Sequence, residues 1–264
     1  MRSLPHDAHT PAEQWAATTR CRVVGVRRFG AFAAVELVAP GIAATARPGQ
    51  FVMVTVPDGG FLLRRPLSLY TARADRVGLL VEARGAGSTR LAAVEVGEAL
   101  DLAGPLGTGF PTQGVAGALL VGGGIGCAPL QFLADTLAGS GTQVTAALGF
   151  RDGRQARVAG AFDLPRLWVA TEDGSVGRRG LVTDVLADLD VPASTTVYCC
   201  GPLPMVAAVQ RWAAAAGVGG YASLEAHMAC GTGSCHGCVV DTSRGLLRVC
   251  SEGPVFALDE VVAR

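Results

Sequence analysis

Four cysteines near the C-terminus are the residues of this chain whose types and spacing most clearly suggest chemistry. They follow the pattern Cys230-x4-Cys235-x2-Cys238-x11-Cys250. The opening C-x4-C-x2-C is the ligand spacing of plant-type [2Fe–2S] clusters. Three glycines stand between the first three cysteines and would let the loop curl around a cluster without Cβ clashes. We therefore predict that the four thiolates hold a [2Fe–2S] cluster, the fourth ligand coming from the strand-like segment LLRVC.

Structural zinc and disulfide bonds are the alternatives for this cluster. Zinc usually takes paired C-x2-C knuckles or adds histidines, whereas this chain has one C-x2-C with His236 inside it. The N-terminal residues MRSLPHDAHTPAEQW have no apolar stretch typical of a secretory leader, so we expect a reducing, cytoplasmic compartment and few disulfides. The other cysteines Cys21, Cys127 and Cys199 are expected to be small buried apolar residues.

A cluster of this kind needs a second cofactor if its electrons come from a nicotinamide. The cluster takes one electron at a time, nicotinamide gives two as hydride, and a flavin can exchange both. The segment Arg64-Arg65-Pro66-Leu67-Ser68 is the flavin candidate, because Pro66 fixes the turn and a guanidinium can pair with a diphosphate. In isolation R-P-x-S would more simply be a surface salt bridge. The segments GAGS (85–88) and GPLGTGF (104–110) add a phosphate-binding loop and close the region.

A glycine-rich segment predicts a nucleotide site. LLVGGGIGCAPL places glycines after a strand and before a helix, where backbone N–H groups can hold a pyrophosphate. It departs from the G-x-G-x-x-G fingerprint of the ordinary dinucleotide fold. The segments ATEDGSVGRRG (170–180) and YCCGPLPM (198–205) follow later strands, and ligands bind at those carboxyl ends in open α/β sheets. Ordinary turns are the alternative for both.

Two different patterns of elements position these motifs. Between residues 20 and 110, short β-like runs alternate with turns and predict a small antiparallel barrel. From residue 115, strands alternate with helices and predict a parallel α/β sheet. The predicted strands and helices of both regions are CRVVGVRRF, FAAVELVA, QFVMVTVP, LSLYTA, VGLLVEA, ALDLAG, GALLVGG, APLQFLADTLAGSG, TQVTAALGF, RLWVATED, LVTDVLADL, STTVYCCG and PMVAAVQRWAAAAG.

The predicted fold class is therefore multi-domain, with a β and an α/β part followed by a small cluster domain. We divide the chain into a flexible N-terminal tail (1–17), an FAD-binding antiparallel β-barrel (18–112), an NAD-binding parallel α/β domain (113–222) and a [2Fe–2S] domain (223–264).

Composition and charge exclude several classes of partner. The chain has 264 residues, 50% of them hydrophobic, and a formal net charge of zero, so nothing indicates nucleic acid or an anionic membrane surface. The run Val115–Ala134 has no charge and could span a membrane by length alone. Its central GGGIG and Pro129 instead favour a strand, a glycine loop and a helix.

The order of barrel, nucleotide domain with GGGIG and CGPLPM motifs, and cluster resembles the ferredoxin–NADP⁺ reductase superfamily. More narrowly, LEAHMACGTGSCHGC…RVCSEGPVF resembles the electron-transfer subunit of class 1B dihydroorotate dehydrogenase. The resemblance runs from about residue 18 to the end and is most specific at the C-terminal motif. It implies that NADH gives hydride to FAD, FAD passes single electrons to the cluster, and the cluster passes them to FMN in a partner catalytic subunit. That subunit would oxidise dihydroorotate to orotate in pyrimidine (UMP) biosynthesis, with a heterotetramer as the implied assembly.

The resemblance also assigns residues to each cofactor. The iron ligands would be Cys230, Cys235, Cys238 and Cys250. The FAD contacts would be Arg65, Pro66, Leu67, Ser68, Leu80, Val81, Glu82, Gly87 and Ser88. The NAD(H) contacts would be Gly122, Gly123, Gly124, Gly126, Asp173, Gly174, Cys200 and Gly201. The chain departs from the family at Ser88, Thr108 and Glu82, where Thr, Asn and Arg are common.

Other functions stay open on the sequence. A related reductase subunit, of the NADH-dependent ferredoxin–NADP⁺ oxidoreductase or sulfide dehydrogenase type, is one, although such relatives often place Asp where Cys230 stands. A non-enzymatic iron–sulfur redox sensor is another, and it would not need the flavin segment. A zinc-stabilised nucleotide-binding scaffold would be colourless. The choice between NADH and NADPH is also open, because Arg151 or Arg154 could face a 2′-phosphate.

Overall fold

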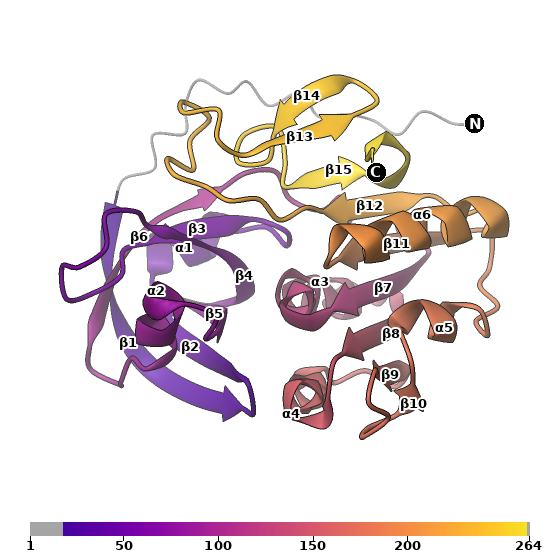
Figure 1. Cartoon of the computed structure of the whole chain (residues 1–264), viewed down its shortest axis with the longest axis horizontal. Coiled ribbons are helices and arrows are strands. Elements are labelled where there is room, and N and C mark those ends of the chain that lie inside the picture. Colours follow the sequence, from indigo (N-terminus) through magenta and orange to yellow (C-terminus); the bar gives the residue numbers. More distant parts are fainter. Residues whose placement is uncertain (1–17, 263–264) are drawn as a thin grey trace.

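The computed structural model describes residues 18–262, which form a β-barrel, an α/β sheet and a C-terminal cysteine-rich segment (Figure 1). The predicted N-terminal tail, residues 1–17, lies outside the described residues. The predicted fold class is confirmed, because six antiparallel strands close into a barrel and a seven-stranded, mainly parallel sheet follows it. The division into domains at residues 112 and 222 stays a prediction.

The barrel has the strand order β1-β2-β5-β4-β3-β6. Its strands are β1 (Thr18–Phe29), β2 (Phe32–Val38), β3 (Phe51–Val54), β4 (Arg65–Arg73), β5 (Arg76–Glu82) and β6 (Ala99–Leu106). Each predicted run of this region overlaps one of them. Two short helices, α1 (Pro40–Thr45) and α2 (Ala86–Ala92), flank the barrel. Strand β4, which carries the flavin segment, lies between β3 and β5 and pairs antiparallel with both.

The sheet has the order β10-β9-β8-β7-β11-β12-β15. Its strands are β7 (Gly117–Gly123), β8 (Gln143–Phe150), β9 (Leu167–Thr171), β10 (Arg178–Arg179), β11 (Thr195–Cys200), β12 (Gly220–Ser223) and β15 (Val255–Ala257). All neighbours are parallel except β15, which pairs antiparallel with β12. The C-terminal segment therefore also completes this sheet.

Helices cover both faces of the sheet (Figure 1). The helices α3 (Cys127–Gly139) and α4 (Gly153–Ala156) lie on the face toward the barrel, and α5 (Val182–Leu186) and α6 (Leu203–Ala216) lie on the other. Buried α3 residues share one apolar core with Phe32, Tyr70 and Leu80 of the barrel. The barrel and the sheet are thus packed together through α3, which fixes the space between them.

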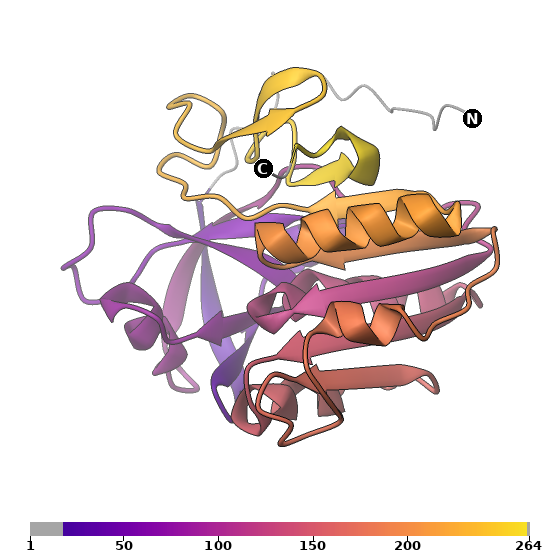
Figure 2. The same ribbon diagram turned by 45° about the vertical axis from the view of Figure 1, so that its right-hand side comes forward.

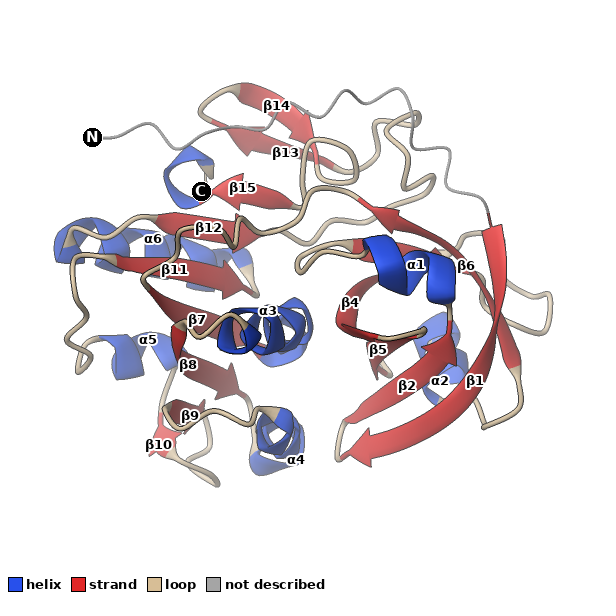
Figure 3. Cartoon of the chain, turned by 180° about the vertical axis from the view of Figure 1, so that it is seen from behind, coloured by secondary structure: helices blue, strands red, loops and turns tan. Residues whose placement is uncertain are grey.

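The C-terminal segment lies across the barrel and the sheet, as Figures 1 and 2 both show. It contains the hairpin of β13 (Val239–Thr242) and β14 (Gly245–Arg248). Cys250 and Phe256 from this segment share a buried core with Phe51 and Met53 of β3. Seen from behind, the cysteine-bearing loop lies above the barrel strands and the hairpin lies above the sheet (Figure 3).

The uncharged run at residues 115–134 forms β7, a 3₁₀ turn at Gly124–Gly126 and the start of α3, as predicted. Within residues 18–262, no helix has both the length and the apolar character needed to cross a membrane. Cys21, Cys127 and Cys199 are fully buried, which confirms their predicted environment.

Candidate functional site

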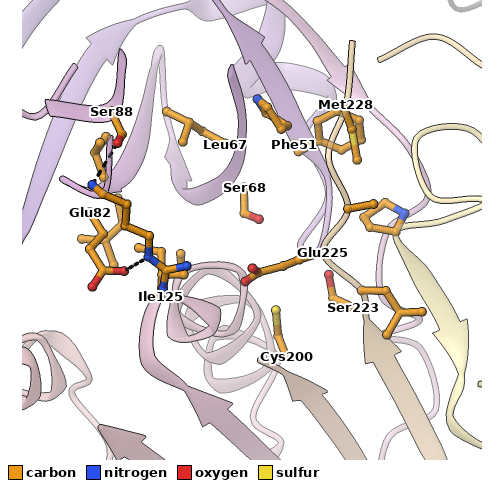
Figure 4. Close-up of a pocket in the computed structure, with 18 residues that line it drawn as sticks. Phe51, Leu67, Ser68, Glu82, Ser88, Ile125, Cys200, Ser223, Glu225 and Met228 are labelled. Carbon is orange, nitrogen blue, oxygen red and sulfur yellow. Dashed lines mark hydrogen bonds and ion pairs between the residues drawn. The ribbon is translucent and has the colours of Figure 1, made fainter. Parts of the chain in front are cut away.

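A pocket of about 240 Å³ opens where the barrel, the sheet and the C-terminal segment meet (Figure 4). The barrel supplies the predicted flavin residues on β4 and β5, the sheet supplies Ile125 and Cys200, and the C-terminal segment supplies Glu225 and Met228. Its lining residues are Phe51, Pro66, Leu67, Ser68, Leu80, Val81, Glu82, Arg84, Ser88, Ile125, Ala128, Cys200, Ser223, Leu224, Glu225, Ala226, Met228 and Pro254. Seven predicted FAD residues and one predicted NAD residue therefore share one pocket.

The two remaining FAD candidates, Arg65 and Gly87, meet directly beside this pocket. A Cβ atom on Gly87 would lie 2.8 Å from both Nε and Nη2 of Arg65, so the guanidinium rests against the glycine backbone. Arg65 also donates to the carbonyl of Leu63 at 2.5 Å and lies over the ring of Phe61. The barrel thus brings a fixed cation onto the first turn of α2, the arrangement expected for a diphosphate.

Ser88 is held inside its own loop. Its hydroxyl accepts from the backbone N–H groups of Arg84 and Gly85, each at 3.0 Å. It also donates to the Gly85 carbonyl. These bonds shape the GAGS turn, while the predicted contact between Ser88 and the diphosphate stays a prediction.

Glu82 connects the barrel to the α/β part. Its carboxylate accepts from Arg84 Nε at 2.5 Å and from Gln155 Nε2 of α4 at 2.8 Å. The Oε1 atom of Gln155 in turn accepts from the backbone N–H of Arg151. The side chain of Glu82 is only 8% exposed. It therefore acts as a bridge across the space between the two parts.

Two ionisable groups face each other across the pocket. Figure 4 shows Glu225 reaching from the C-terminal segment toward Ser68, with Cys200 below it. The carboxyl of Glu225 stays accessible through the open pocket, but the surrounding protein desolvates it and raises its pKa. Burial, and next the charge of Glu225, raise the pKa of the Cys200 thiol. Cys200 therefore presents a neutral thiol to the pocket.

The predicted nucleotide loops pack against each other at the carboxyl ends of β7 and β11. A Cβ on Gly126 would lie 2.2 Å from the carbonyl oxygen of Cys200, so only glycine fits there. Gly201 likewise approaches the backbone N of Gly123. Gly124 has a φ of +56° and no atom within 4 Å of its Cβ position. One side of the loop is therefore open, as a nucleotide site needs.

Asp173 and Gly174 follow β9, at the same carboxyl edge but two strands away from β7. Hydrogen bonds from the hydroxyl and backbone N–H of Ser175, at 2.6 and 3.0 Å, lower the pKa of Asp173. The backbone N–H of Asp173 also meets the Arg151 carbonyl. The edge thus holds an exposed carboxylate close to the exposed Arg151, and the contact of either with a nucleotide stays a prediction.

The four C-terminal cysteines gather around one loop. Backbone N–H groups point at their sulfurs, from Gly233 to Cys250 at 3.1 Å and from Thr232 to Cys230 at 3.4 Å. The backbone N–H of Cys250 itself meets the sulfur of Cys238 at 3.4 Å. Cys238 and Cys250 are buried, and Cys235 is exposed. Such N–H groups stabilise the charge of thiolate ligands.

The thiol environments within this group differ. Burial raises the pKa of Cys250 to about 12. Burial also acts to raise the pKa of Cys230, but hydrogen bonds from Thr232 and Cys235 outweigh it and bring the value to about 6. Among the described residues, no three His, Cys, Asp or Glu side chains converge closely enough to hold a single metal ion.

The cysteine loop lies next to the flavin pocket. Gly231, with a φ of +73°, packs on Met53 of β3, where a Cβ would lie 2.5 Å from Met53 Cγ. Met53 pairs with Pro66 of the flavin segment. Met228 lines the pocket, and Cys230 follows two residues later, a span of at most ~7 Å between Cα atoms. A cluster and a flavin at these positions would be close neighbours.

The residues fit the three predicted groups. Four thiols around one loop, three of them accepting backbone N–H groups, suit a cluster, and Gly231 and Gly233 have the positive φ values that let the loop curl. Arg65 over Gly87 suits a diphosphate, and the apolar walls of the pocket suit a flavin ring. The open side of the GGGIG loop suits a nicotinamide nucleotide.

Several pocket residues were missed by the sequence predictions. Glu225, Ser223 and Met228 line the pocket, and Arg84 faces Glu82. Ser223 ends β12, and Glu225 follows it almost directly. The rule that ligands gather at the carboxyl ends of parallel strands would have found both, had β12 been recognised as part of the sheet.

Comparison with curated proteins gives consistent results along most of the chain. The chain is 39% identical over 249 residues to the "Dihydroorotate dehydrogenase B (NAD(+)), electron transfer subunit" of Shouchella clausii, covering 86% of this chain and 92% of that protein. It is 41% identical over 225 residues to the protein of the same name from a Geobacillus species, covering 81% and 86%. Residues 225–262 match a family model described as the iron–sulfur cluster binding domain of dihydroorotate dehydrogenase B.

Solved structures with a similar fold include an NADH-dependent reduced ferredoxin–NADP oxidoreductase, studied for flavin-based electron bifurcation. It shares 28% identity and a TM-score of 0.83, and the alignment covers 94% of this chain and 91% of that one. The ferredoxin reductase of carbazole 1,9a-dioxygenase shares the fold at 23% identity, with a TM-score of 0.67 over 76% of this chain and 66% of that one.

Proposed function

The chain belongs to the family of dihydroorotate dehydrogenase B (NAD⁺) electron transfer subunits, and from this membership we propose how its residues perform electron transfer. The chain is an oxidoreductase subunit that moves electrons between NAD(H), FAD and a [2Fe–2S] cluster. When bound, FAD and the cluster convert a two-electron hydride into single electrons. The observation that carries the residue assignment is the short segment from Met228, in the flavin pocket, to Cys230, in the cysteine loop.

We propose that the barrel holds FAD through its motif residues. Arg65, fixed over Gly87, pairs with the diphosphate, while Pro66 and Leu67 line the pocket beside the flavin ring. Ser68 presents a hydroxyl to the ring, and Leu80 and Val81 exclude water from its far side. Glu225 and Cys200 line the same pocket and would border the flavin held by these residues (Figure 4).

The sheet holds the nicotinamide nucleotide at its carboxyl edge in this proposal. The backbone N–H groups of the GGGIG loop bind the pyrophosphate. The close contact of Gly126 with Cys200 keeps that loop and the CCGP turn together. Cys200 orients the nicotinamide at the mouth of the pocket with a neutral thiol, which neither repels nor attracts charge there.

The four cysteines ligate the cluster, and the partner takes its electrons. As an electron transfer subunit, the chain works with a separate catalytic subunit. We further propose that this partner carries FMN, that it oxidises dihydroorotate in pyrimidine biosynthesis, and that two copies of each subunit form a heterotetramer. We place the complex in the cytoplasm, since free thiols such as those of Cys21 and Cys199 persist in a reducing compartment.

A related reductase activity is the second candidate. It is favoured by the similarity to the NADH-dependent reduced ferredoxin–NADP oxidoreductase structure. The cysteine at position 230 argues for the first function, because such reductases often have aspartate at this position.

The experiment that tests the proposal is an anaerobic visible spectrum of the purified chain before and after NADH is added. Flavin bands and a broad iron–sulfur shoulder, both bleached by NADH, are the expected result. Adding the catalytic subunit with orotate should then restore the oxidised spectrum. A flavin-free brown protein that NADH leaves unchanged would indicate a redox sensor, and a colourless protein with bound zinc would contradict the cluster assignment.

A further inference from the structure

The two peptide groups that meet at the Cα atom of Gly233 are each held by a hydrogen bond. The N–H of Gly233 donates to the buried sulfur of Cys250 at 3.1 Å. The carbonyl of Gly233, which belongs to the next peptide group, accepts from Nη1 of Arg248 at 2.9 Å. Gly233 has a φ of +85° and lies outside regular secondary structure. Arg248 is therefore linked to a predicted cluster ligand through the backbone of Gly233, although it is not a ligand itself.

Arg248 is itself firmly held. Its Nε and Nη2 atoms both donate to the carboxylate of Glu252, and its backbone N–H donates to the same carboxylate at 2.8 Å. The Arg248 carbonyl accepts from the backbone N–H of Glu252 at 2.9 Å. These bonds close a turn that contains Cys250. The guanidinium thus has a fixed direction, with its Nη1 atom aimed at the Gly233 carbonyl.

We propose that Arg248 is a positioning residue for the cluster: by holding the Gly233 carbonyl it fixes the backbone at Gly233, so that the N–H on the other side of the Gly233 Cα points at the Cys250 sulfur and raises the reduction potential. An N–H group directed at a ligand sulfur stabilises the added negative charge of the reduced cluster, and hydrogen bonds to sulfur are one of the means by which proteins set cluster potentials. Without the hydrogen bond from Arg248, the backbone torsions of Gly233 are free to change and its N–H can turn away from the sulfur. The potential then falls.

Arg248 could also raise the cluster potential simply through its positive charge. Because Arg248 pairs with Glu252, variants of both residues can separate this charge effect from the positioning effect. The ion pair of Arg248 and Glu252 has no net charge. Replacing Arg248 alone removes a cation and leaves an unpaired carboxylate near the cluster, so charge and positioning both lower the potential. Replacing both residues removes one charge of each sign. If Arg248 acted on the cluster potential through net charge alone, the double variant would have the same potential as the unmodified chain.

The experiment compares the full chain with Arg248→Met, the double variant Arg248→Met with Glu252→Gln, and Arg248→Lys. The cluster midpoint potential of each is measured by redox titration followed by EPR, with iron and sulfide content measured beside it. We expect the double variant to reduce its cluster with an equilibrium constant about tenfold lower, which is about 59 mV for one electron. The potential of Arg248→Met should fall further, because its unpaired Glu252 carboxylate adds a charge effect to the lost positioning. Arg248→Lys keeps the charge but lacks the planar fork, so its potential should fall between those of Arg248→Met and the unmodified chain.

Unchanged potentials in the double variant and in Arg248→Lys would overturn the proposal, because charge alone would then explain Arg248. If Arg248→Met is isolated without iron, Arg248→Lys decides the question alone, and an unchanged potential there overturns it. The inference rests on the proposed function. The two fail separately, since an unmodified chain without a cluster refutes the function, whereas equal potentials in cluster-containing variants refute only the role of Arg248.

Discussion

The guanidinium of Arg65 lies directly on the backbone of Gly87, so that a single added Cβ would come within 2.8 Å of two of its nitrogens. The two residues belong to separate motifs, one on β4 and one on α2. Because the atoms in the way are at the end of a flexible side chain, an alanine at position 87 would move Arg65 and leave the fold in place. A substitution at Gly87 can therefore displace the guanidinium of Arg65 while Arg65 itself stays unchanged in the sequence.

We predict that Gly87→Ala weakens FAD binding about tenfold, which corresponds to losing about 1.4 kcal/mol of a charge-assisted hydrogen bond. The melting temperature of the flavin-free chain should stay nearly unchanged. Fluorescence titration of the flavin-free chain with FAD gives the dissociation constant. Gly60→Ala is the matched control, because it lies in the loop before Arg65 and its Cβ would meet no atom within 4 Å. Equal affinity in Gly87→Ala and Gly60→Ala would remove Arg65 from the diphosphate site.

The bridge between Glu82 and Gln155 predicts an effect on NADH rather than on FAD. Gln155 is 5% exposed and bonds to both Glu82 and the backbone of Arg151. Gln155→Ala should cost about 2 kcal/mol of unfolding free energy through the lost buried hydrogen bonds. It should also loosen the packing of α4 against the barrel. We expect the KM for NADH to rise roughly fivefold, with little change in kcat.

Steady-state reduction of an artificial electron acceptor at varied NADH checks this prediction. Gln143→Ala is the control, since Gln143 is an exposed residue of β8 at the opposite edge of the sheet. A KM for NADH that stays constant while stability falls would mean that the bridge is purely structural.

Glu225 predicts a pH dependence of stability. Burial raises its pKa in the folded chain, the charge of Arg84 opposes this and that of Glu82 adds to it. The folded state therefore binds this proton more tightly than the unfolded state. Its contribution to stability is complete below the ordinary glutamate pKa and is lost as pH rises through the raised value.

The stability difference between the unmodified chain and Glu225→Gln should therefore become less favourable to the unmodified chain as pH rises. Urea unfolding of the flavin-free proteins from about pH 5 to about pH 8 measures it. Glu95→Gln, at an exposed site of the barrel, provides the comparison. A difference that is the same at both ends of the range would place the Glu225 carboxyl in an environment like water.

The sequence predicted those parts of the site that depend on local spacing. The cysteine spacing predicted a cluster domain at the C-terminus, which the family model over residues 225–262 confirms, because the predicted ligands lie close together in the chain. The R-P-x-S and GAGS segments were assigned to one cofactor. Their contact through Arg65 and Gly87 could not be predicted, because it exists only once β4 and β5 pair in the closed barrel.

Other parts depend on contacts that leave no periodic signal. The three-residue strand β15 is too short for a recognisable pattern, yet it completes the sheet beside β12. Glu225 follows β12, a four-residue strand that is also too short to be recognised, and it was therefore missed. The bond from Arg248, at the end of β14, to Gly233, in the irregular cysteine loop, joins residues that are not neighbours in sequence, and neither residue type predicts it. Irregular segments are positioned by single side-chain contacts rather than by periodicity.

Cys235, an exposed cysteine and a proposed cluster ligand, gives the cleanest test of the cluster site. The side chain of Cys235 is exposed, so Cys235→Ala should not disturb the fold of the chain, even when no cluster is bound. We predict that this variant loses the iron–sulfur absorbance and about two iron atoms per chain, while it keeps its FAD. NADH should still bleach the flavin bands. Transfer to the catalytic subunit should stop, because the path from flavin to partner then has no one-electron carrier.

The matched control is Cys21→Ala, which removes a thiol that is fully buried in the barrel core and distant in sequence from the loop. It should lose about 1 kcal/mol of stability through the small cavity and keep its iron, its flavin and its transfer activity. Iron analysis and the visible spectrum distinguish the two variants. Retention of iron in Cys235→Ala would mean that another group near the loop replaces this thiolate, with the nearby His236 as the first to substitute. Loss of FAD together with iron would instead show that the cysteine loop supports the flavin pocket through Gly231 and Met53, whose packing joins the two sites.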